Sequence, residues 1–332
     1  MARAWQLASR PSGKATRDNF KLVEMELPPL GPGEVRVRNH FLSVEPAMRA
    51  MMEKTEGNPM WLELDEPIFG RAVATVAESR SGKFKEGDLV FHYKGWRDEA
   101  VVPEAEVEML PQDPAVPKEY YLSILGMPGV TAYFGLTEIG QPKAGETLFV
   151  SAAAGSVGSN VLQIGKALGL TVIGSAGGPE KCALVRELGA DAAIDYRKGD
   201  LQAQIKAAAP NGIDIYFDNV GGDHLDAALG NAATFARFVI CGMIDTYNHA
   251  DQRQKVPFGN MMRLVASQIT MRGFIVGGFE HRIGESREIL GRWLKEGRIR
   301  PLLAISDGLE STPDTFLGLF EGKNTGKAMV RL

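Results

Sequence analysis

The chain has 332 residues, 44 % of them hydrophobic, which is enough for a sizeable core and for roughly two domains. Its 37 basic and 41 acidic residues leave a net charge of −4, which argues against a surface built to bind nucleic acid. Two cysteines are too few for a disulfide framework or a zinc lobe of four thiolates, and they suit a reducing compartment.

The N-terminal segment lacks the apolar core of a signal peptide. No apolar run approaches the roughly 18 residues of a membrane span. We therefore expect a cytoplasmic protein whose partners are small molecules, with neither nucleic acid nor membrane among them.

Short strands separated by glycine and proline dominate the first part of the chain, up to about residue 125. Residues 34–38 alternate strictly between apolar and polar, and residues 70–76 and 87–91 form further strand-like runs. This pattern predicts an all-β, barrel-like domain over residues 1–125.

From about residue 126, predicted strands alternate with predicted helices. The strands fall at 148–151, 171–175, 192–194, 213–219, 235–241 and 269–276, and the helices at 157–168, 180–188, 222–232 and 284–296. This alternation is typical of a doubly wound parallel sheet of the Rossmann type, here over residues 126–300. The tail, 301–332, is expected to hold a helix near 314–320 and a strand at 327–331.

A glycine-containing loop follows the first strand of this second region, where residues 152–158 read Ala-Ala-Ala-Gly-Ser-Val-Gly. Gly155 would let the backbone approach a pyrophosphate, and Gly158 would let the next helix pack close to its strand. The helix N-terminus offers N–H groups to the phosphates. Ala153 stands where the first glycine is usual. Strand, loop and helix together predict a nicotinamide dinucleotide site.

The end of the second strand favours NADPH over NADH. An NAD site usually carries an acidic residue about 20 residues past the glycines, but here that place is Ser175-Ala176. Lys181, in the first turn of the next helix, could hold a 2′-phosphate, and the glycines at 177 and 178 leave room for it.

A barrel-like domain followed by this nucleotide fold resembles the medium-chain dehydrogenase/reductase superfamily, some of whose members use a catalytic zinc. Where those relatives carry a cysteine and a Gly-His-Glu, this chain reads Ser-Val-Glu-Pro at 43–46 and Ile-Phe-Gly-Arg at 68–71. Its histidines show no ligand spacing: His40, His92, His224, His249 and His281. We therefore expect no metal, which favours hydride transfer to an activated carbon-carbon double bond over alcohol oxidation.

The stretch at 43–49, Ser-Val-Glu-Pro-Ala-Met-Arg, is similar to the Val-Asp-Pro-Tyr-Met-Arg stretch of the zinc-free leukotriene B4 dehydrogenase and prostaglandin reductase family, which includes plant double-bond reductases and bacterial curcumin reductase. Further similar stretches lie at 125–133, 217–222, 240–248 and 322–327, so the resemblance spans nearly the whole chain. It implies a GroES-like β-barrel domain, completed by about 301–332, and a Rossmann NADP-binding domain.

The resemblance also implies site residues. The glycine loop would hold the pyrophosphate, and Lys181 with Tyr196 would hold the 2′-phosphate. The complete set of expected cofactor contacts is Gly155, Ser156, Val157, Gly158, Lys181, Tyr196, Asn219, Cys241, Tyr247, Phe274, Ile275, Val276 and Asn324.

Tyr247 is the residue expected nearest the reaction. Hydride addition to the β-carbon of an enone puts negative charge on the carbonyl oxygen, which a phenol could stabilise or protonate. The alternative is a tyrosine that only walls the pocket. Ala47, at a place where the family often has tyrosine, would line the substrate pocket with Met48 and Met51, although core packing is the commoner use of methionine.

The function expected from these residues is NADPH-dependent reduction of the double bond of apolar α,β-unsaturated ketones or aldehydes, without a metal. Quinone reduction with the same cofactor is one alternative, and a catalytically silent NADPH-binding regulatory protein is another. The family commonly forms homodimers, and residues 269–279 provide an apolar edge strand that could pair with a second copy.

Overall fold

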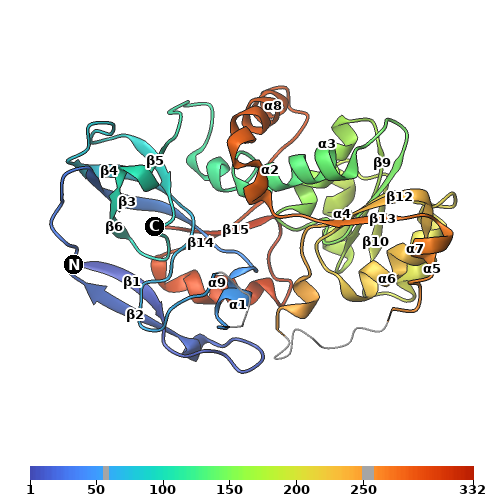
Figure 1. The fold of residues 1–332 in the computed structure, drawn as a ribbon, viewed down its shortest axis with the longest axis horizontal. Coiled ribbons are helices and arrows are strands. Elements are labelled where there is room, and N and C mark those ends of the chain that lie inside the picture. The colour runs from blue at the N-terminus through green and yellow to red at the C-terminus, as the bar shows by residue number, and fades with distance from the viewer. Residues whose placement is uncertain (55–59, 249–257) are drawn as a thin grey trace. The chain divides into compact units, whose positions relative to one another are not determined.

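The computed structural model describes residues 1–54, 60–248 and 258–332, and the chain divides into two compact units (Figure 1). The mixed-sheet unit consists of Met1–Leu122, Tyr247–Ala250 and Leu303–Leu332. The parallel-sheet unit consists of Ser123–Thr246 and Asp251–Leu302. Each unit is built around a sheet of its own.

A seven-stranded sheet forms the centre of the mixed-sheet unit, in the order β14-β15-β3-β4-β5-β7 with β6 paired to β3. β14 and β15 are parallel, and the other pairs are antiparallel. β1 and β2 form a separate antiparallel pair. The elements are β1 (Ala2–Leu7), β2 (Phe20–Met25), β3 (Glu34–Ser43), α1 (Met48–Met51), β4 (Ala72–Ser79), β5 (Leu89–His92), β6 (Glu99–Pro103), β7 (Glu108–Met109), β14 (Leu303–Asp307), α9 (Thr312–Leu319) and β15 (Lys327–Arg331).

Alternation in β3 explains how this sheet buries one face. Val35 and Val37 point into a core cluster that also holds Val76 and Val102, while the residues between them stay partly exposed. The strands predicted at 34–38, 70–76 and 87–91 are present as β3, β4 and β5, so the prediction of a β-rich first region is confirmed.

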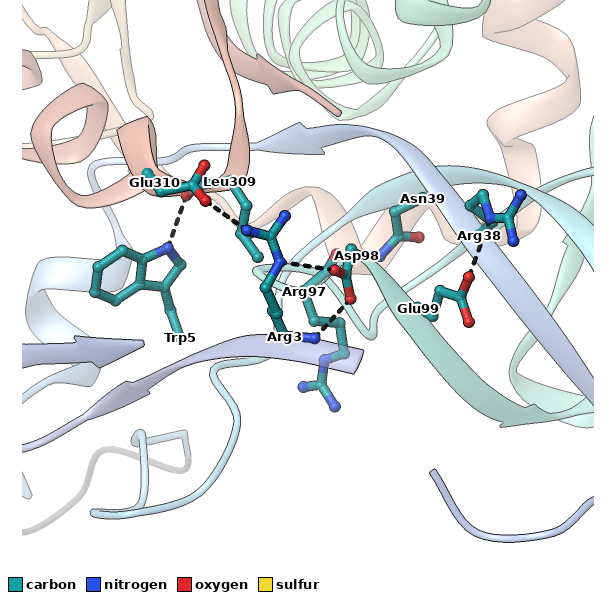
Figure 2. A network of polar contacts seen from close by, with 9 residues as sticks. All are labelled: Arg3, Trp5, Arg38, Asn39, Arg97, Asp98, Glu99, Leu309 and Glu310. Atoms are coloured by element: carbon teal, nitrogen blue, oxygen red, sulfur yellow. Dashed lines mark hydrogen bonds and ion pairs between the residues drawn. The ribbon is translucent and has the colours of Figure 1, made fainter. Parts of the chain in front are cut away.

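Polar contacts tie β1 to the C-terminal part of the chain (Figure 2). The guanidinium of Arg3 forms ion pairs with Asp98 and with Glu310, and its backbone N–H donates to Asp98 at 2.8 Å. The indole Nε1 of Trp5 donates to the carbonyl oxygen of Leu309 at 2.7 Å in a buried setting. The first strand and residues beyond 300 therefore belong to one packed body.

The parallel-sheet unit has the strand order β10-β9-β8-β11-β12-β13, with all pairs parallel. Numbered from β8, this is the 3-2-1-4-5-6 order of a Rossmann sheet, so the predicted class is confirmed. The strands are β8 (Thr147–Val150), β9 (Thr171–Ala176), β10 (Ala192–Asp195), β11 (Ile213–Asp218), β12 (Ala232–Ile240) and β13 (Thr270–Gly273). The helices are α2 (Met127–Phe134), α3 (Gly158–Ala167), α4 (Pro179–Glu187), α5 (Leu201–Ala208), α6 (Gly222–Gly230), α7 (Arg263–Ala266) and α8 (Ile283–Lys295).

The last strand of this sheet is shorter than the prediction of 269–276. β13 ends at Gly273, because its partner β12 ends at Ile240, the residue in register with Gly273. Among the described residues no strand continues alongside β13 beyond that point, and Val276 begins a turn of 3-10 helix. Among the described residues no helix combines the length and the apolar character needed to cross a membrane.

Candidate active site

The loop between β8 and α3 is shaped by close backbone contacts. A Cβ atom on Gly158 would overlap the carbonyl oxygen of Ala152, so the start of α3 can approach β8 only with glycine there. Ala152 has φ of +48°, in the left-handed region that residues with a Cβ rarely adopt. The sharp turn of the loop thus falls on Ala152. It lies one residue before Ala153, which stands where the first glycine of the motif is usual.

One polar atom of this loop has no partner in the described part of the chain. The hydroxyl oxygen of Ser156 is buried and forms no hydrogen bond, although its own backbone carbonyl accepts one from Asn160 at 3.0 Å. A buried hydroxyl costs free energy unless something bonds to it. A pyrophosphate oxygen would supply that partner, so the loop fits the dinucleotide that its sequence predicts.

The end of β9 gathers a second polar group. Gly177 has no side chain, and a Cβ there would lie 2.8 Å from both the hydroxyl of Tyr196 and Nε of Arg197. The guanidinium of Arg197 lies 5.9 Å from the centre of the Tyr196 ring. Burial, and then the charge of Arg197, lower the pKa of Lys181. Arg197 thus adds a second cation to the two residues expected here, Lys181 and Tyr196.

Arg197 is absent from the residues expected from the sequence. The available signal was the run Tyr-Arg-Lys at 196–198, which follows directly on β10. The carboxylate of Asp195, at this turn, accepts the N–H groups of Gly178 at 2.9 Å and Arg197 at 3.2 Å. These bonds lower the pKa of Asp195 and compensate its charge. The cluster is therefore suited to a phosphate.

His224, at the start of α6, packs edge-on against the Tyr196 ring, with centroids 5.1 Å apart. It is buried, and its Nε2 has no hydrogen-bond partner among the described residues. Burial lowers its pKa to about 4, which keeps the ring neutral.

Asn219 lies where β11 ends, beside the end of β8. Its side-chain amide donates to the carbonyl oxygen of Ser151 at 2.9 Å, and its backbone N–H donates to the Ser151 hydroxyl at 2.8 Å. β8 and β11 flank the point where the strand order reverses, which is where such sheets bind their ligands.

Asp218 organises this strand end, and sequence reasoning missed it. The fully buried carboxylate accepts N–H groups of Val220 and Gly221, both at 2.9 Å, and the hydroxyl of Tyr216 at 2.7 Å. Burial nevertheless raises its pKa. A lone Asp-Asn pair at a strand end gives no sign of this role, because the partners come from a loop and a neighbouring core residue.

Cys241 directly follows the end of β12, and Phe274 directly follows the end of β13. The N–H of Cys241 donates to the carbonyl oxygen of Asp218 at 2.9 Å, and burial raises the pKa of its thiol to about 12. The Cys241 thiol therefore stays protonated at neutral pH. Phe274 packs its ring toward Gly135 and Phe217, whereas Ile275 is 85 % exposed.

Val157 directly precedes α3 in the parallel-sheet unit, and the remaining expected residues lie in the mixed-sheet unit. Met48 is part of the buried core with Met52, which is the core-packing role given above as the alternative to lining the substrate pocket. Met51 is only partly buried. Ala47 is exposed just before α1. Tyr247 is half-buried, and Asn324 donates from its side-chain amide to the carbonyl oxygen of Gly326 at 3.0 Å, in the turn before β15.

The two stretches that lack zinc ligands lie side by side, since the N–H of Ser43 donates to the carbonyl oxygen of Arg71 at 2.8 Å. Glu45 and Arg71 form an ion pair there. In the described ranges no group of three His, Cys, Asp or Glu side chains is placed to hold a metal ion.

Comparison with known proteins agrees with this architecture. Residues 3–110 match the N-terminal domain of oxidoreductases, and residues 156–293 match the zinc-binding dehydrogenase family. The chain is 41 % identical to an NADPH-dependent curcumin reductase of Escherichia coli, covering 99 % of this chain and 96 % of that protein. It is 42 % identical to an NADP(+)-dependent 2-alkenal reductase of Nicotiana tabacum, covering 91 % and 88 %.

A solved structure is equally similar. The crystal structure of CurA from Vibrio vulnificus in complex with NADPH superposes with a TM-score of 0.93 at 41 % sequence identity, covering 99 % of this chain and 98 % of that one.

Proposed function

The chain belongs to the medium-chain dehydrogenase/reductase superfamily, in the same family as curcumin reductase and 2-alkenal reductase, and from this premise we propose that it reduces the carbon-carbon double bond of α,β-unsaturated ketones or aldehydes with NADPH. The observation that carries the proposal is the 41 % identity to an NADPH-dependent curcumin reductase across 99 % of the chain. The parallel-sheet unit is proposed to bind NADPH, and the mixed-sheet unit to supply substrate contacts.

NADPH supplies a hydride, and the residues of the protein bind the cofactor. Gly155, Gly158 and the Ser156 hydroxyl are placed to hold the pyrophosphate. Lys181 and Arg197, with the Tyr196 hydroxyl, would hold the 2′-phosphate. Asn219, Cys241, the backbone at 274–276 and Asn324 remain proposed contacts along the cofactor.

Tyr247 is proposed to act on the substrate oxygen. When the hydride adds to the β-carbon, the double-bond electrons move toward the carbonyl, and an enolate results. The phenol of Tyr247 would donate a hydrogen bond or a proton to that oxygen, and the α-carbon then takes a proton from the phenol or from water. The second reading, a tyrosine that only walls the pocket beside Ala47 and Met51, gives the same product with water as the proton source.

The test is NADPH oxidation with a panel of an aryl enone, a short alkenal and a quinone, with product identification by mass spectrometry. We expect the enone and the alkenal to gain two hydrogens at the double bond while the carbonyl remains. Turnover of the quinone alone would replace the proposal by quinone reduction. Tight NADPH binding without turnover of any acceptor would indicate a silent binding protein.

We further propose that the protein is cytoplasmic and forms a homodimer through β13. β13 is an edge strand whose four residues are all exposed, and Ile275 beyond it is exposed as well. Such an edge is a template for pairing with another copy. Sedimentation should give a dimer. Met271→Lys, on β13, should give monomers, whereas Leu22→Lys, on β2 and equally exposed, should not.

A further inference from the structure

A cluster of three charged side chains lies at one place in the mixed-sheet unit. Glu45 follows the end of β3, Arg71 precedes β4, and Lys327 begins β15. One carboxylate oxygen of Glu45 pairs with Nη1 of Arg71. The other accepts the Ser43 hydroxyl at 2.7 Å and lies 3.5 Å from the ammonium of Lys327. Both oxygens of this carboxylate therefore already have hydrogen-bond or ion-pair partners.

The cluster carries more positive than negative charge. The two cations lower the pKa of Glu45 to about 2 against the opposing effect of its burial, so it is ionised. Burial, and then the charge of Arg71, lower the pKa of Lys327 to about 8, so at pH 7 it is mostly protonated. Its ammonium also donates to the carbonyl oxygen of Val44 at 3.0 Å. Of the salt bridges among described residues, none brings a second carboxylate to these cations, which leaves a net charge of +1.

Arg71 is the member of the cluster that a ligand could reach. Its side chain is 24 % exposed, against 3 % for Lys327. Its Nε is buried and has no hydrogen-bond partner among the described residues. The ring of Tyr93 flanks it, with the guanidinium carbon 5.6 Å from the ring centre. Because Lys327 leaves the three groups with one positive charge in excess, an anion is attracted to the exposed part of the guanidinium.

We propose that the Glu45–Arg71–Lys327 cluster binds a negatively charged oxygen of the substrate, with Arg71 as the contacting residue and Glu45 and Lys327 as positioning residues. The inference rests on the proposed function, because Ala47, the expected pocket residue, stands two positions after Glu45. The oxygen has two possible sources. It is either a carboxylate carried by the substrate, or the carbonyl oxygen that becomes negative as hydride adds to the β-carbon.

The experiment compares para-carboxybenzalacetone with its methyl ester, two aryl enones that differ in one negative charge. The variants are Arg71→Gln, Arg71→Lys and, as control, Arg38→Gln, which removes an exposed arginine paired with Glu99 on the same sheet. Thermal unfolding and NADPH affinity establish that each variant is folded.

If the oxygen is a substrate carboxylate, Arg71→Gln should raise KM for the acid at least about tenfold and leave the ester unchanged. If it is the carbonyl oxygen, kcat should fall at least about tenfold for both compounds with little change in KM. In either case Arg71→Lys should recover part of the loss, and Arg38→Gln should match the wild type.

Kinetic constants of folded Arg71→Gln within about twofold of wild type for both compounds would overturn the inference. Wild-type protein that reduces neither compound would instead contradict the proposed function. Calorimetric binding of the acid, and of the ester as its reference, to wild type and Arg71→Gln then tests the carboxylate site by itself. Equal affinities of the two proteins for the acid would overturn it.

Discussion

Arg197 strengthens the preference for NADPH over NADH that we expect of this protein. This arginine lies beside Gly177, and with burial its charge lowers the pKa of Lys181, so two cations lie near the end of β9, where the single lysine expected from the sequence would be a weaker selector. We expect Arg197→Ala to raise the Kd for NADPH about tenfold and to leave that for NADH unchanged. Fluorescence titration with both cofactors measures this. The neighbouring Lys198→Ala removes a largely exposed ammonium and serves as the control. Equal losses for NADPH and NADH would mean that Arg197 has no role at the 2′-phosphate.

Tyr247→Phe separates the two roles considered for this residue. If the phenol assists the enolate, turnover of a simple enone should fall at least about tenfold, since a positioned proton donor contributes on the order of a hundredfold or more. Tyr121→Phe, which removes a hydroxyl bonded to the carbonyl oxygen of Pro111, should leave turnover unchanged. Unchanged turnover in Tyr247→Phe would leave this tyrosine as a pocket wall.

The residues that sequence could and could not reveal differ in where their partners come from. Lys181 and Gly158 could be singled out from the sequence, because the roles proposed for them depend on a strand, a loop and a helix that follow one another in the chain. Arg197 was missed because the paired strands β9 and β10 bring it beside Gly177, and only the run Tyr-Arg-Lys hints at it. Asp218 was missed although the partners described above are only two or three residues away, because no pattern of residue types marks such a role. Met48 shows a different ambiguity: it lies in the buried core, the commoner use of methionine, and its place in the substrate pocket stays a prediction.

The start of α3 offers a sharp test of helix-to-strand packing. Gly158→Ala would force a methyl group against the carbonyl oxygen of Ala152, so the helix must move away from β8. We expect a loss of about 3 kcal/mol or more in the free energy of unfolding, together with loss of NADPH binding. Gly284→Ala, in α8 with open space around the new methyl, should be neutral or slightly stabilising. Denaturant unfolding of both variants checks this, and similar stability of the two would show that α3 adapts freely.

Elements were predictable where pattern and context agreed, as in the alternation of strands and helices of the parallel-sheet unit. The short helix α5 was not expected, although Asp200 caps it by accepting the N–H of Ala203. The end of β13 was misplaced because the sequence at 274–276 still looks like a strand. β13 ends at Gly273 because the neighbouring strand, β12, ends at Ile240.

Acid should destabilise the protein. Burial lowers the pKa of His92 from 6.5 to about 3, and Nδ1 of this ring accepts the N–H of Lys94 at 3.0 Å, which a protonated ring could not do. Between pH 6.5 and 3 the unfolded chain therefore binds a proton that the folded chain does not. Stability is full above pH 6.5 and falls as the pH drops toward 3.

The loss should reach a few kcal/mol, because each unit of pKa difference corresponds to about 1.4 kcal/mol. The carboxylate of Glu45 extends the same trend from about pH 4.5 down toward 2. Thermal unfolding from pH 7 to 4 measures the effect. His92→Gln should show a shallower decline than the wild type, and an identical decline would show that other groups dominate.

The position of β15 has a consequence for how the chain acquires its structure. This strand lies between β14 and β3, yet it consists of residues 327–331 of a 332-residue chain. During synthesis residues 41–43 of β3 therefore lack this partner until β15 has been made, although β4 and β6 can already pair with the rest of β3. The parallel-sheet unit is almost contiguous and is free to fold while the ribosome is still working. Truncation before Lys327 should thus spare the parallel-sheet unit and leave β14 and the end of β3 without their shared partner, open to aggregation and proteolysis.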